Sequence, residues 1–113
     1  MENIEKYKNI VKNSLLEIAQ WIPFDDKIAV ETIFDDQRGH YLLLTVGWEN
    51  DRREYAILLH IDIKTNGRVY LQHDGTDLEF ALRLAEKGIL KSDMVIAYRS
   101  PFQRQFIENF AQV

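Results

Sequence analysis

Four short stretches of alternating apolar residues, spread over residues 28–71, constrain the fold more than any other feature of this chain. Successive side chains of a strand point to opposite faces, so every second residue shares a face. Apolar side chains recur in this way over residues 28–34, 40–48, 54–64 and 69–71. Only short connections separate these stretches, which favours antiparallel pairing of neighbours. The sequence therefore predicts a four-stranded antiparallel meander.

The apolar positions also predict which residues face each other. A loop at residues 35–39 places Thr32 opposite Leu42, and a turn at Asn50-Asp51 places Leu42 opposite Leu59. A three-residue loop ending in Gly67, with the glycine in the left-handed conformation, continues the same apolar face into the last strand. The face expected to meet the core carries Leu42, Leu44, Val46, Trp48, Tyr55, Ile57, Leu59, Ile61 and Ile63.

The opposite face of the predicted sheet mixes apolar and polar side chains. Because large apolar patches are seldom left exposed, we expect the C-terminal segment or a second subunit to cover it. Arg38, Arg52 and Arg53 are expected at one end of the meander, among acidic residues, a mixture that suits a protein partner. The candidate partner or ligand surface comprises Tyr41, Leu43, Leu58, His60, Asp62, Tyr70, Gln72, Arg38 and Arg53.

Helices are predicted before and after the meander in the sequence. Apolar residues recur at three- and four-residue spacing over residues 2–22, and Pro23 should end that helix. Thr76 and Glu79 have the spacing of a capping box at the start of a second helix. Residues 94–98 suit a short fifth strand, and Ser100-Pro101 starts a last helix that carries Phe102, Phe106 and Phe110 on one stripe. The chain is expected to be one α+β domain, residues 1–113.

Composition excludes several classes of protein. The chain has 14 basic and 18 acidic side chains and a net charge of −4, so it has no basic stripe for phosphates and we expect no direct DNA binding. It has no cysteine, which rules out disulfides and thiolate sites. No apolar run approaches the ~20 residues that span a bilayer, and the N-terminus is polar, so we expect a cytoplasmic protein without membrane contact.

The sequence contains no convincing catalytic, cofactor or metal motif. His40 and His73 are expected on or near the core face and His60 on the mixed face beside Asp62, so a three-histidine metal site is not predicted. A weak divalent site or an acid–base pair at His60 and Asp62 is an alternative to a structural histidine. Residues 72–77 resemble the DxDGT loop of haloacid-dehalogenase phosphatases, but Gln72 stands where that loop needs its aspartate nucleophile. We therefore predict a protein that is not an enzyme.

These residues together resemble the XisI family, the fdxN-element excision controlling factors of cyanobacteria. The likeness spans nearly the whole chain, with Leu90 standing where proline is expected and Asp77 where glutamate is usual. The matching pieces are Phe34-Asp35, Arg38, His40–Leu43, Val46–Trp48, Leu59–Ile63, Gln72–Thr76, Gly88-Ile89, Lys91, Asp93, Val95, Pro101 and Arg104.

The resemblance implies a small α+β protein that acts in programmed excision of a DNA element by a site-specific recombinase. It also implies a second factor, XisH, which looks nuclease-like, and we expect this chain to bind and regulate an XisH-type partner. A homodimer is expected as well. Alternatives are an antitoxin-like nuclease inhibitor, a small-ligand-binding domain at His60 and Asp62, and a hydrolase that uses His60 with Asp62 or His73 with Asp74.

Overall fold

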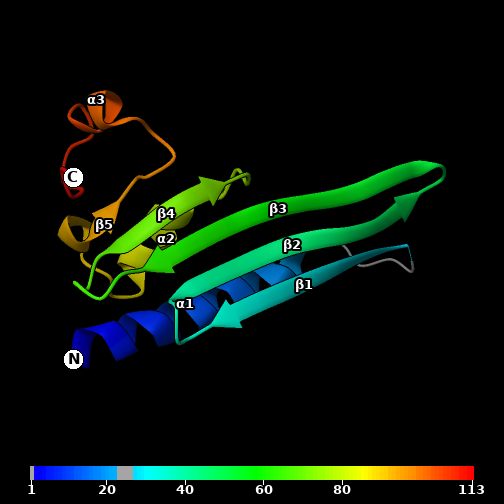
Figure 1. Ribbon diagram of the computed structural model, residues 1–113, viewed down its shortest axis with the longest axis horizontal. Helices are drawn as coiled ribbons and strands as arrows, with labels where there is room; N and C mark the ends of the chain where they lie inside the picture. Colours follow the sequence, from blue (N-terminus) through cyan, green and yellow to red (C-terminus); the bar gives the residue numbers. More distant parts are fainter. Residues whose placement is uncertain (1, 23–26) are drawn as a thin grey trace.

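The computed structural model describes residues 2–22 and 27–113 and shows a mixed sheet with its main helices on one side (Figure 1). Pro23, expected to end the first helix, lies outside the described residues. The elements are α1 (Glu2–Trp21), β1 (Ile28–Asp35), β2 (His40–Glu49), β3 (Arg52–Ile63), β4 (Val69–Asp74), α2 (Phe80–Glu86), a 3₁₀ turn (Lys91–Asp93), β5 (Met94–Val95) and α3 (Pro101–Arg104). The predicted α+β class is confirmed.

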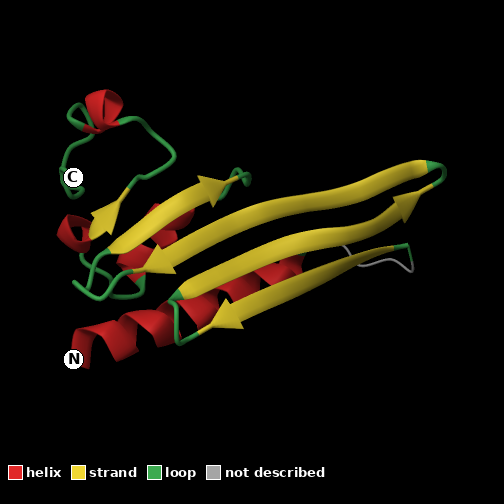
Figure 2. Ribbon diagram, in the orientation of Figure 1, coloured by secondary structure: helices red, strands yellow, loops and turns green. Residues whose placement is uncertain are grey.

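The sheet has the order β1-β2-β3-β4-β5. Its first four strands form the predicted antiparallel meander, and β5 joins the edge parallel to β4, with Val69 opposite Met94. Figure 2 shows α1 and α2 behind the strands, with the C-terminal segment beyond β5 at one end. The long β2–β3 hairpin extends away from that end, which gives the molecule an elongated shape of 44 × 31 × 24 Å.

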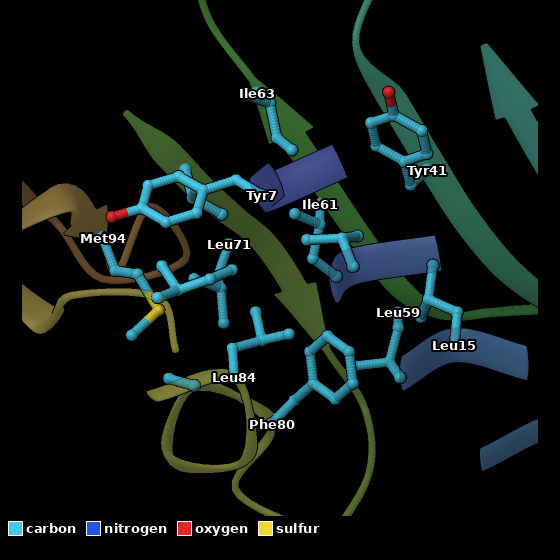
Figure 3. Packing of buried hydrophobic residues seen from close by; sticks show 14 of the residues in the cluster. Tyr7, Leu15, Tyr41, Leu59, Ile61, Ile63, Leu71, Phe80, Leu84 and Met94 are labelled. Carbon is cyan, nitrogen blue, oxygen red and sulfur yellow. The ribbon is translucent and has the colours of Figure 1, made fainter. Parts of the chain in front are cut away.

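The core lies between the sheet and the two helices α1 and α2. Tyr7 and Leu15 of α1, with Phe80 and Leu84 of α2, meet strand side chains in one buried cluster (Figure 3). The strand residues of this cluster are Tyr41, Leu43, Leu59, Ile61, Ile63, Val69 and Leu71. Burial of these side chains supplies most of the driving force for folding, at roughly 1.5–3 kcal/mol for each large apolar residue.

The predicted pairing of β1 with β2 is wrong by one residue. Thr32 faces Leu43, not Leu42, because the loop closes on the pair Asp35–His40. Gly39 makes this tight loop possible: its φ is +76°, its carbonyl accepts a hydrogen bond from Ile63 N at 2.7 Å, and a Cβ there would lie 2.3 Å from Ile63 O. A shift of one residue exchanges the two faces of a strand.

A β-bulge at Leu58 reconciles this shifted strand with the rest of the sheet. Leu44 pairs with Ile57, but Leu59 pairs with Leu43 and not with Leu42 as predicted, which leaves Leu58 as the extra residue. The N-terminal half of β3 and all of β2 therefore present the opposite faces from those expected. Leu42, Val46, Trp48, Tyr55 and Ile57 point away from the core, as does Leu44, which neighbouring side chains bury.

The last hairpin agrees with prediction. Ile63 pairs with Val69, Ile61 pairs with Leu71, and Gly67 has a φ of +86° in the connecting loop. A second bulge lies between His60 and Ile61, and His60 consequently faces His73.

The start of α2 differs from the predicted capping box. The helix begins at Phe80, and Thr76 hydrogen-bonds locally, so it does not cap the helix. Asp74 organises the turn: its Oδ1 accepts from Thr76 N at 2.9 Å, and its Oδ2 accepts from Phe80 N at 3.1 Å. The carboxylate holds an amide of the first helical turn from six residues upstream.

The predicted start of the last helix is confirmed, but its length is not. Ser100 and Gln103 form a capping box, and Pro101 occupies the first turn. The helix then ends at Arg104, so Phe102, Phe106 and Phe110 do not share one helical stripe. Phe110 is partly buried against the core, whereas Phe102 and Phe106 stand exposed.

Candidate interaction surfaces

Tyr41 and Leu43, two residues predicted to lie on an exposed partner surface, are buried in the core. Both side chains are 0% exposed. The Tyr41 hydroxyl donates a hydrogen bond to Asp36 Oδ1 at 2.8 Å, and Lys12 Nζ of α1 binds Asp36 Oδ2 at 2.9 Å. Burial, together with the Asp36 carboxylate, raises the pKa of Tyr41, and the Lys12 hydrogen bond lowers the pKa of Asp36. These groups hold α1 on the sheet.

Leu58 is half-buried at the bulge, and its carbonyl accepts a hydrogen bond from Gly75 N at 2.7 Å. Arg38 and Arg53 lie at opposite ends of the sheet, not at one end as predicted, because successive connections of a meander alternate ends (Figure 1). Arg38 stays near Asp35, with its amide 2.9 Å from Asp35 Oδ1.

The surface that the described chain leaves uncovered is the sheet face opposite α1, here called the open face. It carries Ile33, Leu42, Leu44, Val46, Trp48, Arg53, Tyr55, Ile57, His40, His60 and Asp62. Four of its large apolar side chains are well exposed: Ile33 at 50%, Trp48 at 52%, Tyr55 at 64% and Ile57 at 41%. A contiguous exposed apolar surface of this kind marks an interaction site.

The hairpin end of the open face is aromatic and cationic. The Arg53 guanidinium lies 5.4 Å from the ring centroid of Trp48 and 5.6 Å from that of Tyr55. Cation–π contact holds the three side chains as one cluster. Trp, Tyr and Arg are the residue types that contribute most to protein–protein binding energy.

The other end of the open face is polar. It brings together three histidines that were predicted to lie on different faces of the sheet. His40 Nδ1 lies 3.2 Å from His60 Nε2, and His73 faces His60 across β3 and β4. Burial, and next the neighbouring His40, lower the pKa of His60. His40 and His73 are thus on the open face, not on or near the core face as predicted. This clustering could not be predicted from alternation of side chains, because each of the two bulges shifts the pairing of strands by one residue.

Asp62 is buried beside these histidines and is already paired. Its Oδ2 lies 3.1 Å from Lys64 Nζ and accepts a hydrogen bond from Gln72 Nε2 at 3.2 Å. Tyr70 completes the group, with Lys64 Nζ 5.4 Å from its ring centroid. Within residues 2–22 and 27–113, no group of three or more His, Asp or Glu side chains is arranged to hold a metal ion.

The C-terminal segment forms a second exposed apolar surface. It was not predicted, because the four-residue spacing of its phenylalanines fits one stripe of a helix. Phe102 and Phe106 are each 70% exposed and pack edge to face, with ring centroids 5.4 Å apart. The same segment contributes Ile107 and Phe110 to a groove of about 300 Å³. This C-terminal surface comprises Glu79, Ala81, Leu82, Ile96, Tyr98, Arg99, Phe102, Phe106, Ile107 and Phe110.

Cations stand beside these aromatic rings. Arg99 lies with its guanidinium 5.1 Å from the ring centroid of Tyr98, and Arg104 hydrogen-bonds the Arg99 carbonyl at 2.9 Å. The C-terminal surface therefore offers exposed aromatic anchors and a shallow groove that both Arg99 and Glu79 line, an arrangement that suits an apolar partner segment with polar flanks.

Comparison with known proteins gives a consistent result. The family model described as XisI protein matches residues 1–112. A solved XisI-like protein from Anabaena variabilis ATCC 29413 is 32% identical, with a TM-score of 0.89 over 96% of this chain and 98% of that one. The fdxN element excision controlling factor XisI of the same organism has this fold, at 24% identity and a TM-score of 0.83 over 98% and 99% of the two chains. A search of curated proteins finds no significant match. None of the described helices is long and apolar enough to cross a membrane.

Proposed function

The chain belongs to the XisI family, and from that premise we propose that it controls excision of a DNA element by binding an XisH-type, nuclease-like partner. A solved protein with the same fold is described as an fdxN element excision controlling factor, which supports the excision role. The mode of control that we propose is protein contact, without chemistry of its own and without direct reading of DNA.

The observation that carries this proposal is the pair of exposed phenylalanines on the C-terminal surface. The neighbouring side chains of Phe102 and Phe106 are each 70% exposed. A partner that covers them gains binding free energy of roughly 25 cal/mol per Å² of apolar surface buried. The net charge of −4 favours a protein partner over a phosphate backbone. A small interface with aromatic anchors and a polar rim is typical of partners that associate reversibly.

Co-expression with the XisH-type protein of the same source tests the proposal. We expect the two chains to co-purify through size exclusion, and we expect Phe102→Asp with Phe106→Asp to abolish the mixed complex. Leu16→Asp is the matched control, because Leu16 is an exposed apolar residue on α1, away from this surface. Absence of a mixed complex with the unmodified chain would overturn the proposal.

The same experiment distinguishes control of excision from an antitoxin-like role. If the mixed complex forms and the partner shows nuclease activity, addition of this chain at increasing ratios measures inhibition directly. Simple inhibition that saturates at equal amounts favours the antitoxin-like form. Activity of the complex at a defined DNA end, absent from either chain alone, favours excision control.

A further inference from the structure

The open face has two chemically different ends at equal distances from an apolar centre. The pair Leu44–Ile57 forms the centre, where both side chains point away from α1. The pair Trp48–Arg53 lies four residues from Leu44 along β2 in one direction. The pair His40–Asp62 lies four residues from Leu44 in the other direction. At about 3.3 Å per residue, each end stands about 13 Å from the centre.

The two ends complement one another. The hairpin end presents the Arg53 guanidinium between two aromatic rings. The other end presents the His40 and His60 imidazoles, 3.2 Å apart, whose unprotonated nitrogens accept hydrogen bonds. The nearby carboxylates of Asp62 and Asp35 are already paired with Lys64 and Arg38. A guanidinium held between aromatic rings donates hydrogen bonds to unprotonated imidazole nitrogens, and the imidazole rings pack against the aromatic side chains.

We propose that a second copy of this chain packs on the open face about a two-fold axis that crosses the strands at Leu44–Ile57. Each copy then places Trp48, Arg53 and Tyr55 over the His40, His60 and Asp62 of the other. A two-fold interface must be self-complementary, and an apolar centre with complementary ends at equal spacing meets that requirement. The histidine cluster becomes a composite site to which both copies contribute.

The shape of the chain supports a permanent contact at this face. Its radius of gyration is 14.8 Å, whereas a compact chain of this length has about 13 Å. The excess comes with the β2–β3 hairpin, which projects from the rest of the molecule (Figure 2). Its exposed aromatic side chains, Trp48 and Tyr55, lie on the open face. A second copy covers that hairpin on its apolar side. This inference does not depend on the partner proposed above, which is assigned to the C-terminal surface.

Cysteine cross-linking tests the arrangement directly, because the chain contains no cysteine of its own. At the axis, Ile57 meets its own copy, so Ile57→Cys should form a cross-linked dimer with copper phenanthroline or a short bismaleimide. Trp48 lies about 26 Å from its own copy, so Trp48→Cys alone should not cross-link. A mixture of Trp48→Cys and His40→Cys chains should cross-link, because these two positions meet across the axis.

Sedimentation gives the second measurement. We expect the unmodified chain to sediment near 27 kDa, twice its mass of 13.4 kDa, and Tyr55→Asp to weaken the dimer at least about tenfold in Kd. Phe102→Asp should leave the dimer intact. A monomeric unmodified chain, equal cross-linking of Trp48→Cys and Ile57→Cys, or a dimer lost in Phe102→Asp and kept in Tyr55→Asp would each overturn the proposal.

Discussion

His40 Nδ1 lies 3.2 Å from His60 Nε2, and this contact joins β2 to β3 on the open face. Two imidazoles at this distance share one hydrogen bond when both are neutral and repel each other when both are protonated. The pKa of His60 is accordingly lowered, first by burial and next by His40. The cluster therefore links the stability of the sheet to pH.

The free energy of unfolding should fall in mild acid. The ordinary pKa of histidine is about 6.5, and that of His60 in the folded chain is lower, so the unfolded state binds its proton first. Stability should therefore be constant above about pH 7.5, fall as the pH drops through about 6.5, and level off below the folded pKa. Urea unfolding at fixed protein concentration measures this profile.

The control for this prediction is a comparison of two histidine variants. His60→Asn should remove much of the slope between about pH 7.5 and 5.5, whereas His73→Asn should keep most of it, because the His73 side chain is exposed. Equal slopes in the unmodified chain and His60→Asn would contradict the assignment.

The bulged register predicts which apolar side chains matter for folding. Leu43→Ala should lower the free energy of unfolding by about 2–5 kcal/mol, because it leaves a cavity against α1. Ile33→Ala, at a half-exposed position on the open face, should cost clearly less. Equal costs, measured by urea unfolding, would indicate that the faces are the other way round.

The hydrogen bond from Tyr41 to Asp36 should contribute modestly to stability. Tyr41→Phe removes the hydroxyl that binds Asp36 Oδ1 at 2.8 Å and should cost about 1 kcal/mol. Tyr55→Phe, on the exposed hairpin, is the matched control and should cost much less. The exposed Asp36 carboxylate keeps its Lys12 partner in the variant, so the loss is limited to one hydrogen bond.

Asp74 should act as the cap of α2 although it lies outside the helix. Asp74→Ala leaves the Phe80 and Thr76 amides without their carboxylate partner and should cost about 0.5–2 kcal/mol. Asp77→Ala, an exposed acid three residues on, should change stability little. If thermal unfolding shifts equally in both variants, general charge and not capping explains the effect.

The meander, the N-terminal helix and the last hairpin were predictable from the sequence because each rests on a strong local signal. The 3.6-residue period marks α1, and Gly67 fixes one hairpin loop. The faces of β2 were not predictable, since residues 41–44 are apolar at every position and fit either register. Gly39, packed against the Ile63 backbone, fits the loop that sets the register, and that contact is not local in the sequence.

The errors in the predicted interaction surface have the same cause, the register of β2. Tyr41 and Leu43 were predicted at the partner surface only because β2 was given the wrong face, while Arg53, His60 and Asp62 remained on the open face. The bulge at Leu58 exchanges the two faces of β3 halfway along the strand. The residue types of β3 give no indication of the bulge. The exposed Phe102 and Phe106 were missed because their four-residue spacing fits a helix that ends at Arg104.

The mass of the mixed complex tests the central claim most directly, because that claim assigns self-association and partner binding to separate surfaces. Light scattering on the complex purified with the XisH-type protein should give two copies of this chain together with the partner. Tyr55→Asp should reduce the chain to one copy and retain the partner. A complex that holds a single copy of the unmodified chain, or loss of the partner in Tyr55→Asp, would contradict the account.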